Sequence, residues 1–594
     1  MYNELNTEQK NAVKEDGNVL VIACPGSGKT RVLTLRIAKN LMELESKKQC
    51  IVALTYTNRA AEEIHQRIEK LEVDTSQLWT GTIHSFCVNW ILKPYAGYIQ
   101  ELKDGFSIID EFTHEQLLKV IKEEYFLSPF VENITAFKRN GDYKTNDQNI
   151  KNAAKEFHTR LLNSKFIDFD LILYFSYRLL LEKPKIARTL SRFMKNFYID
   201  EFQDTQDLQY GIIGEIIKSS GNTSSIFIVG DPDQAIYESL GGQAKTLDEI
   251  QQDIGGAKIK ELHLSGNYRS SQRIIDLYSY FQMNEIKIIA LGKKAKTQGI
   301  ITYNQTLPKN DLHKEIARLI KKSLDQGIPE SEICVVAPRW IFLTDIARKL
   351  KGELPTVSFD APGLTPLPRN PDNFWYKLAR LFLTRPSPGL YLTRIRWVKE
   401  IINDLNFIGV YSQVDDYDNC RKMLNIINRI KPNETDGIKY LSASFKELFK
   451  KINVDITNEK LRLHWETFFS GIIKRSERED FKHIPTDVNS FKSMFMQSKG
   501  VVINTCHGVK GEEYETVISF GLLRGYIPHW NQIINRSYQT EFSASNKMLY
   551  VIGSRAKTNL HLISETGRFT INGNSYEPNY QLNSLTFNYD YDLI

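Results

Sequence analysis

A glycine-rich segment near the N-terminus carries the residues with the clearest chemistry. Residues 23–30 read ACPGSGKT; they follow an apolar run and precede a helical pattern. In such a context, backbone N–H groups and the start of a helix surround phosphate oxygens, while a lysine reaches the β- and γ-phosphates and a threonine binds Mg²⁺. The alternative is a plain turn before a helix. The pattern favours a phosphate-binding loop made of Ala23, Cys24, Pro25, Gly26, Ser27, Gly28, Lys29 and Thr30.

An acidic pair ends a second apolar run, Phe197–Ile199, and supplies the other groups that a nucleoside triphosphatase needs. Asp200 is expected to hold Mg²⁺ through water, and Glu201 is expected to activate the attacking water. Taken alone, two acidic residues after an apolar run often mark the start of a surface helix. The extension of this pair to DEFQDT favours the catalytic interpretation.

Short apolar runs that alternate with helical patterns position these residues. The alternation predicts a parallel sheet covered by helices. A second block of the same kind begins near Glu332 and resumes near residues 501–523, and each block is interrupted by a mainly helical, charge-rich stretch. The runs expected to form strands of the first block are Val19–Ala23, Ile51–Leu54, Gln77–Thr82, Phe197–Ile199, Ile226–Gly230 and Ile259–Leu264.

The pattern divides the chain into an α/β fold with two cores and two insertions. The first core is expected at residues 1–92 and 195–280, with a helical insertion at 93–194. The second core is expected at 281–384 and 491–570, with a shorter insertion at 385–490. Residues 571–594 lack helical periodicity, so a terminal strand, a flexible tail and a docking segment all remain open for them.

Composition excludes several other classes of protein. The 594 residues include 41% hydrophobic and 25% charged residues, which is ordinary for a globular chain of several domains. The net charge of +6 permits nucleic-acid binding without indicating it. The six cysteines are scattered, which argues against a disulfide scaffold and a zinc site. No apolar run approaches the roughly 18 residues of a membrane span, so we expect a cytoplasmic protein without a membrane partner.

Further segments resemble superfamily 1A helicases of the UvrD/Rep/PcrA type, because the motifs of that family occur here in the same order. The resemblance covers both α/β blocks and implies two RecA-like cores of the P-loop NTPase class that share one ATP and its Mg²⁺ in the cleft between them. The motifs are LNTEQ (Leu5–Gln9), LTYTN (Leu54–Asn58), TIHSF (Thr82–Phe86), VGDPDQAIY (Val229–Tyr237), NYRS (Asn267–Ser270), TCHGVKGEEY (Thr505–Tyr514) and YVIGSRA (Tyr550–Ala556).

The resemblance implies nucleotide contacts from both cores. Arg269 and Arg555 are the expected arginine fingers, which stabilise transition-state charge and can contribute about 10³ to 10⁵ in rate. Gln234 is expected to sense the γ-phosphate and to link hydrolysis to the DNA groove. The contacts with adenine, with the ribose and in support of the site are expected from Gln9, Tyr268, Glu513 and Lys510.

The same resemblance implies a single-stranded DNA site. Tyr56 offers a stacking face for a base, although an aromatic residue at a strand end is by itself more typical of a core. The backbone contacts are expected from Thr55, Thr57, His84 and His507.

Two departures from the family pattern affect the expected activity. The family continues its third motif with a tryptophan that stacks between bases, and Ser239 occupies that position here. The usual Glu-Glu-Arg-Arg before the last motif is replaced by the residues 544–547, ASNK.

The leading hypothesis is an ATP-dependent translocase and helicase acting on single-stranded or tailed duplex DNA, with the 3′→5′ direction implied by the resemblance alone. The alternative is a DNA-responsive ATPase subunit of a Gabija-type antiphage complex, with a nuclease partner and little unwinding.

Overall fold

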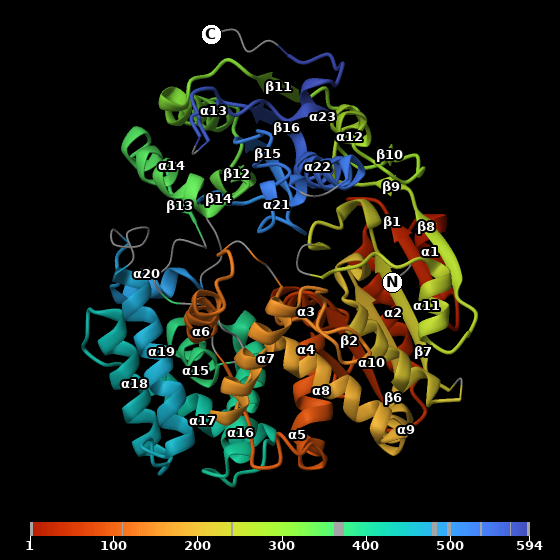
Figure 1. Cartoon of the computed structure of the whole chain (residues 1–594), viewed down its shortest axis with the longest axis vertical. Helices are drawn as coiled ribbons and strands as arrows, with labels where there is room; N and C mark the ends of the chain where they lie inside the picture. The colour runs from red at the N-terminus through yellow and green to blue at the C-terminus, as the bar shows by residue number, and fades with distance from the viewer. Residues whose placement is uncertain are drawn as a thin grey trace.

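The computed structural model of the 594-residue chain contains two α/β lobes and a separate helical region (Figure 1). Among the described residues, none of the helices is both long enough and apolar enough to cross a membrane. The structure describes residues 4–109, 111–129, 131, 133–221, 223–238, 241–361, 367, 373–477, 484–495, 500–534, 537–570 and 572–590.

The first lobe is built on a six-stranded sheet in which all neighbouring strands are parallel. Because parallel strands end at the same edge, the segments that follow β1, β2, β6 and β7 emerge side by side. Helices α1 (Thr7–Lys14), α2 (Lys29–Met42), α3 (Asn58–Glu69) and α10 (Asp207–Lys218) belong to this lobe. The strand order is β3 (Leu78–Thr82), β2 (Cys50–Thr55), β6 (Met194–Asp200), β7 (Ser225–Gly230), β1 (Val19–Ala23) and β8 (Lys260–Leu264).

The second lobe contains another six-stranded parallel sheet, which confirms the predicted α/β class with two parallel cores. The four inner strands are almost fully buried, as helix-covered parallel strands require, and the two edge strands are partly exposed. The order is β11 (Ile300–Asn304), β16 (Ala556–Ile563), β15 (Tyr514–Ser519), β12 (Ile333–Ala337), β14 (Val501–Thr505) and β13 (Phe359–Asp360), and the main helices are α12 (Gln272–Ser279), α13 (Leu312–Asp325), α14 (Trp340–Glu353), α21 (Trp530–Ile533) and α22 (Tyr538–Gly553).

The first insertion shares a continuous hydrophobic core with the first sheet. Phe86, Phe157 and Phe197, which come from the sheet edge, from the insertion and from β6, all belong to that core. The insertion therefore extends the first lobe instead of forming an independent unit. Its helices are α6 (Glu111–Glu124), α7 (Gln148–Asn163), α8 (Phe169–Glu182) and α9 (Pro184–Phe193), reached from β3 through α4 (Ile83–Phe86), a π-helix (Cys87–Leu92) and α5 (Lys93–Tyr95).

The second insertion has its own hydrophobic core around Trp375, which is fully buried. Helix α15 lies within the range 281–384 expected for the second core, yet its buried side chains and Phe491 all pack into the insertion. The packing therefore moves this boundary back to about residue 373. The helices are α15 (Phe374–Leu383), α16 (Tyr391–Ile408), α17 (Tyr417–Arg429), α18 (Gly437–Lys451), α19 (Glu459–Glu477) and α20 (Val488–Ser493).

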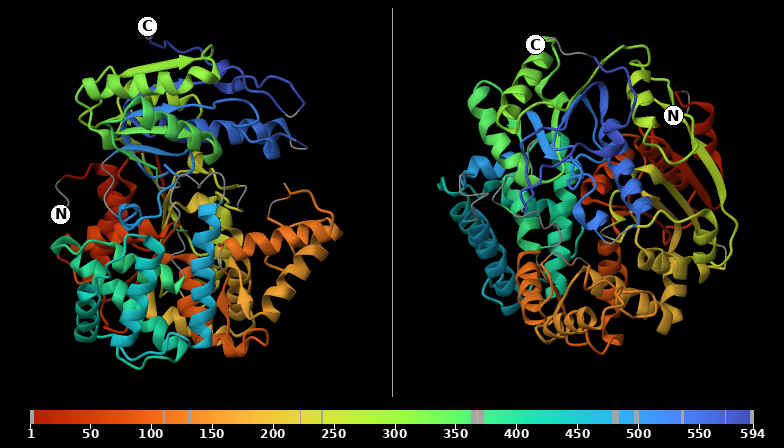
Figure 2. Two further views of the ribbon diagram at one scale, coloured as in Figure 1. Left: turned by 90° about the vertical axis from the view of Figure 1, so that its left-hand side faces the viewer. Right: turned by 45° about the horizontal axis from the view of Figure 1, so that its top comes forward.

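This second insertion lies against the first lobe, and the views in Figure 2 show the two regions side by side. Arg396 of α16 bonds Glu62 of α3 at 2.9 Å. Asp404, also on α16, pairs with Lys93 at 3.1 Å and with Lys377 at 2.7 Å. The insertion thus contacts the opposite lobe from the one in whose sequence it lies.

Two further segments belong to the second lobe by packing. Helix α12 lies in the range 195–280 expected for the first core, but its apolar side chains pack with those of α22 and β16. The C-terminal segment docks on the same lobe, which decides between the three possibilities left open by the sequence. Phe587 and Tyr589 pack against its core, and Asp590 accepts hydrogen bonds from Arg273 at 2.6 Å and from the Ile301 N–H at 2.8 Å.

Candidate active site between the two lobes

The glycine-rich loop between β1 and α2 is shaped to receive an anion. Gly26 and Gly28 adopt left-handed backbone angles, with φ of 68° and 81°. Gly28 is the N-cap of α2 and has no side chain to satisfy the first N–H groups of the helix, which begins at Lys29. The Ser27 hydroxyl is buried and has no hydrogen-bond partner among the described residues. These free donors at a helix start fit a phosphate group.

Asp200 and Glu201 lie beside this loop at the end of β6. Burial, together with the charge of Glu201, raises the pKa of Asp200 to about 7. Burial also opposes the charge of Glu201, but Lys29 and Lys510 outweigh it and hold the pKa of Glu201 below its usual value. Two buried carboxylates next to each other are stabilised by a cation. These carboxylates, together with the hydroxyl of Thr30 at the start of α2, are a donor set of the kind that Mg²⁺ prefers.

Arg555, from the end of α22 in the second lobe, reaches the first lobe. Its side chain is only 1% exposed and donates to Gln234 Oε1 at 2.8 Å and to the Glu512 carbonyl at 3.1 Å. Burial and the neighbouring charge of Arg269 lower the pKa of Arg555 to about 10, and the charge of Glu201 opposes this shift. The structure therefore brings Arg555, Gln234 and Glu201 together.

Arg269 approaches the phosphate-binding loop from the other side. A Cβ added to Gly26 would lie 2.7 Å from the Arg269 Cβ, so only glycine permits this approach. The Arg269 guanidinium donates to Glu513 at 2.6 Å and to the Ser554 carbonyl at 2.9 Å. Arg269 thus lies next to the loop that carries Lys29, and Arg555 lies near enough to Arg269 for their charges to interact.

The residues expected at adenine and ribose have protein partners. Gln9 is 3% exposed; its amide accepts from the Asn6 N–H at 3.1 Å and donates to the Ser27 carbonyl at 2.8 Å. Glu513 is paired with Arg269, whereas Tyr268 is 40% exposed beside the loop. A nucleotide that used all three would have to replace the bonds of Gln9 and Glu513, while Tyr268 is open to stacking.

A row of rings runs from the first lobe to the second. Tyr56 follows β2 and stacks on Tyr237, with ring centroids 4.6 Å apart and planes inclined by 24°. Tyr237 in turn lies 5.7 Å from the His507 ring of the second lobe and donates from its hydroxyl to the His507 carbonyl. Tyr56 is 41% exposed, so it is not a core residue. The Ser239 position lies outside the described residues.

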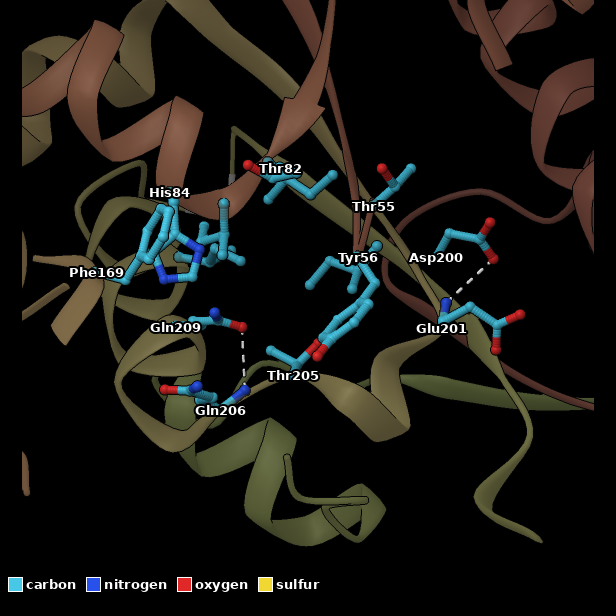
Figure 3. A pocket seen from close by; sticks show the side chains of 14 residues that line it. Thr55, Tyr56, Thr82, His84, Phe169, Asp200, Glu201, Thr205, Gln206 and Gln209 are labelled. Atoms are coloured by element: carbon cyan, nitrogen blue, oxygen red, sulfur yellow. Dashed lines mark hydrogen bonds between the residues drawn. The ribbon is translucent and has the colours of Figure 1, made fainter. Parts of the chain in front are cut away.

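A cavity of about 250 Å³ joins this row to the carboxylates (Figure 3). Thr55, Tyr56, His84 and Phe169 line one part of it, and the Asp200–Glu201 pair lines another. The His84 and Phe169 rings meet edge to face at 5.0 Å. Burial lowers the pKa of His84 to about 4, so this imidazole is neutral at physiological pH and would contact DNA as a hydrogen-bonding group.

Thr57 caps a helix, in addition to the DNA contact that is expected of it. Its hydroxyl accepts from the Ala60 N–H at 3.2 Å and caps α3. The Thr55 hydroxyl donates to the Thr57 carbonyl at 2.8 Å. These bonds hold the chain in a fixed turn immediately after Tyr56.

Several residues at the site were not assigned from the sequence. Lys510 donates to Asp204 at 2.6 Å and to the Gln234 carbonyl at 2.5 Å, which makes Asp204 a partner between lobes. Asp204 belongs to the DEFQDT run, so its position in that run was the available signal. Tyr237 lay in a recognised motif and Phe169 in the predicted first insertion, but stacking and cavity walls depend on residues far apart in sequence.

Comparison with known proteins agrees with this arrangement. Residues 5–255 match the UvrD/REP helicase N-terminal domain. The chain is 25% identical to the ATP-dependent DNA helicase PcrA of Bacillus subtilis over 94% of its own length and 82% of that protein. It is 24% identical to the ATP-dependent DNA helicase PcrA of Staphylococcus aureus (strain Mu50), over 96% of the chain and 84% of the relative. The similarity therefore spans both lobes and both insertions.

Proposed function

Because this chain is a UvrD/Rep/PcrA-like member of superfamily 1A, we propose that it is an ATP-dependent DNA helicase that hydrolyses ATP between its two lobes. The observation that carries this proposal is the hydrogen bond between Arg555 of the second lobe and Gln234 of the first. One nucleotide in this place would touch both lobes. Its binding and hydrolysis would then change how the lobes are held together.

Each part of ATP hydrolysis is assigned to particular residues of the chain. Lys29 and the N–H groups at the start of α2 bind the phosphates, and Thr30 and Asp200 hold Mg²⁺, which neutralises phosphate charge when bound. Glu201, kept ionised, orients the attacking water and accepts its proton. Arg269 and Arg555 stabilise the charge that develops on the transferred phosphoryl group.

The partner is single-stranded DNA or a duplex with a single-stranded tail. Tyr56 is 41% exposed while it stacks on Tyr237, so its ring would be the one to meet a base, and stacking on an aromatic ring tolerates any base sequence. His507 places a group of the second lobe at the same row of rings. Movement in the 3′→5′ direction is part of the proposal and rests on the family resemblance.

A second candidate is a DNA-responsive ATPase subunit with a nuclease partner, as in a Gabija-type complex. The observation that favours it is in the sequence, which has Ser239 where the family has a stacking tryptophan. Loss of one stack would remove about 1–3 kcal/mol per base from single-strand binding. Such a protein would hydrolyse ATP on DNA without separating strands.

Two assays on the purified full chain separate these candidates. The first measures ATP hydrolysis with and without single-stranded DNA, and the second measures strand displacement on duplexes with a 3′ tail, a 5′ tail or no tail. Stimulated hydrolysis together with displacement from the 3′ tail supports the helicase. Stimulated hydrolysis without displacement supports the second candidate, and absence of ATP hydrolysis contradicts both.

A further inference from the structure

Gln203 occupies an unusual position directly behind the candidate water-activating residue. It lies in the short 3₁₀ turn Phe202–Asp204 and is 1% exposed. Its Nε2 donates to Glu201 Oε2 at 2.5 Å, and its Oε1 accepts from the Asp231 N–H at 3.1 Å. The amide therefore connects the loop after β6 with the loop after β7.

We propose that Gln203 is a positioning residue that holds the Glu201 carboxylate in one orientation toward the attacking water. The proposal rests on the proposed function, in which Glu201 activates that water. Glu201 adopts a left-handed backbone angle, φ 55°, which a residue with a Cβ adopts only at a cost. Its side chain also lies within the field of Lys29 and Lys510, both of which attract it. The bond from Gln203 selects one of the available rotamers.

The same amide links Glu201 to the second lobe through an unbroken series of hydrogen bonds. Asp231, whose N–H is bound by Gln203, accepts from Gln234 Nε2 at 2.7 Å. Gln234 Oε1 in turn accepts from Arg555 at 2.8 Å. Any displacement of Arg555 relative to β7 is thereby transmitted to the group that orients the carboxylate.

Gly230, the last residue of β7, makes room for this arrangement. A Cβ at that position would lie 2.2 Å from Gln203 Oε1 and 2.6 Å from Phe202 Cδ1. A contact under 3.0 Å forces one of the two groups to move. Here the group is the Gln203 amide, which is bonded to the loops after β6 and β7. Substitution of Gly230 therefore tests the position of Gln203 without removing any chemical group.

The experiment compares steady-state ATP hydrolysis by the full chain, with single-stranded DNA present, for the wild type and three variants. Gln203→Met conserves volume and removes both hydrogen bonds, and Gly230→Ala displaces the amide. We expect kcat to fall by about 10- to 100-fold in both, with the KM for ATP unchanged, because misplacement of a reacting group by about 1 Å costs rate and not ground-state binding. Gly352→Ala is the control, since a Cβ there meets nothing within 4 Å.

A double variant distinguishes positioning from general structural support. If Gln203 acts through Glu201, Gln203→Met added to Glu201→Gln lowers kcat no further than Glu201→Gln alone. Full kcat in Gln203→Met overturns the inference, as does a rise in KM with kcat unchanged. If Gln203→Met fails to fold, Gly230→Ala decides in the same way. A wild type that hydrolyses no ATP contradicts the proposed function itself.

Discussion

The Arg555 guanidinium donates a 2.8 Å hydrogen bond to the Gln234 side chain, and the two residues come from different lobes, 321 positions apart in the chain. Both side chains are at most 2% exposed. Among the described residues no carboxylate contacts this buried cation directly, so it relies on the polar groups around it, which are Gln234, two carbonyls and the Ser554 hydroxyl. The contact thus ties the position of the second lobe to the residue expected to sense the γ-phosphate.

Replacement of Lys29 by alanine should abolish ATP turnover. The lysine supplies the positive charge at the phosphate-binding loop, and loss of one preorganised group of this kind costs about 100-fold or more. The measurement is phosphate release at saturating ATP. Lys48→Ala, at an exposed position outside the site, is the matched control. Comparable turnover in the two variants would contradict the assigned role of Lys29.

Glu201→Gln should retain nucleotide binding and lose hydrolysis. The amide keeps the size of the side chain but accepts no proton, and a general base typically contributes about 10² to 10⁴ in rate. The check is a filter-binding or calorimetric affinity for ATP together with single-turnover hydrolysis. Normal hydrolysis would show that another group activates the water.

Tyr56→Ala should weaken single-stranded DNA binding by about 1–3 kcal/mol, because a stacking face is lost. ATP hydrolysis without DNA should change little. Fluorescence anisotropy with a labelled oligonucleotide measures the affinity, and Tyr98→Ala is the control at another exposed tyrosine.

The partner ring offers a second test of the same site. Tyr237→Ala should reproduce part of the loss, and the double variant should lose less than the sum, since the rings stack on one another. Unchanged DNA affinity in all three variants would assign the stack a structural role.

Lys510→Met should destabilise the protein. Lys510 and Asp204 form a buried pair at 2.6 Å, and removal of one partner of such a pair costs about 3–5 kcal/mol because the other charge is left without compensation. Burial already raises the pKa of Asp204 to about 6. The deficit should therefore be smaller at pH 5, where Asp204 takes up a proton, than at pH 8.

The free energy of unfolding from denaturant titrations at the two pH values measures this effect. Lys314→Met is the control, because its pair with Asp311 is largely exposed and such pairs contribute at most about 1 kcal/mol. Equal effects of the two substitutions would contradict the buried-pair argument.

His84 should contribute to acid destabilisation. Its pKa is about 4 in the folded chain and near 6.5 when unfolded, so only the unfolded state gains this proton as the pH falls from 6.5 to 4. Stability is lost over that interval, by roughly 3 kcal/mol at the lower end. His84→Gln should flatten this part of the stability curve, as measured by urea unfolding. An unchanged slope would mean that His84 does not titrate in this way.

Local patterns in the sequence were sufficient to predict the six strands of the first sheet, whereas β11, β13 and β16 of the second sheet were not predicted. The run VLVIA followed by CPGSGKT predicts β1, the turn and α2, because a buried strand and a glycine-rich turn have local signatures. The first insertion was placed by its helical periodicity. The predicted limits of the second insertion and the predicted lobe of α12 differ from those in the structure. Helical periodicity does not reveal which lobe buries the apolar face of a helix.

The candidate residues could be predicted from the sequence to different degrees. Lys29, Asp200 and Glu201 were predicted from chemistry and spacing along short segments, whereas the residues expected from the second block rested on family resemblance. Gln203 and Asp204 belong to the DEFQDT run, but their contacts could not be predicted, because their partners Asp231 and Lys510 lie on other loops. Contacts of this kind have no signature in the spacing of one chain segment.

The sequence by itself determined which chemical groups stand at the ends of which strands, because strand, turn and helix start are encoded by neighbouring residues. Only the tertiary structure decided that Arg555 meets Gln234, that Tyr56 stacks on Tyr237 and that Gln203 joins Glu201 to Asp231. These contacts arise where two separately folded sheets and their loops pack together. Their geometry depends on the shape and burial of many distant side chains at once.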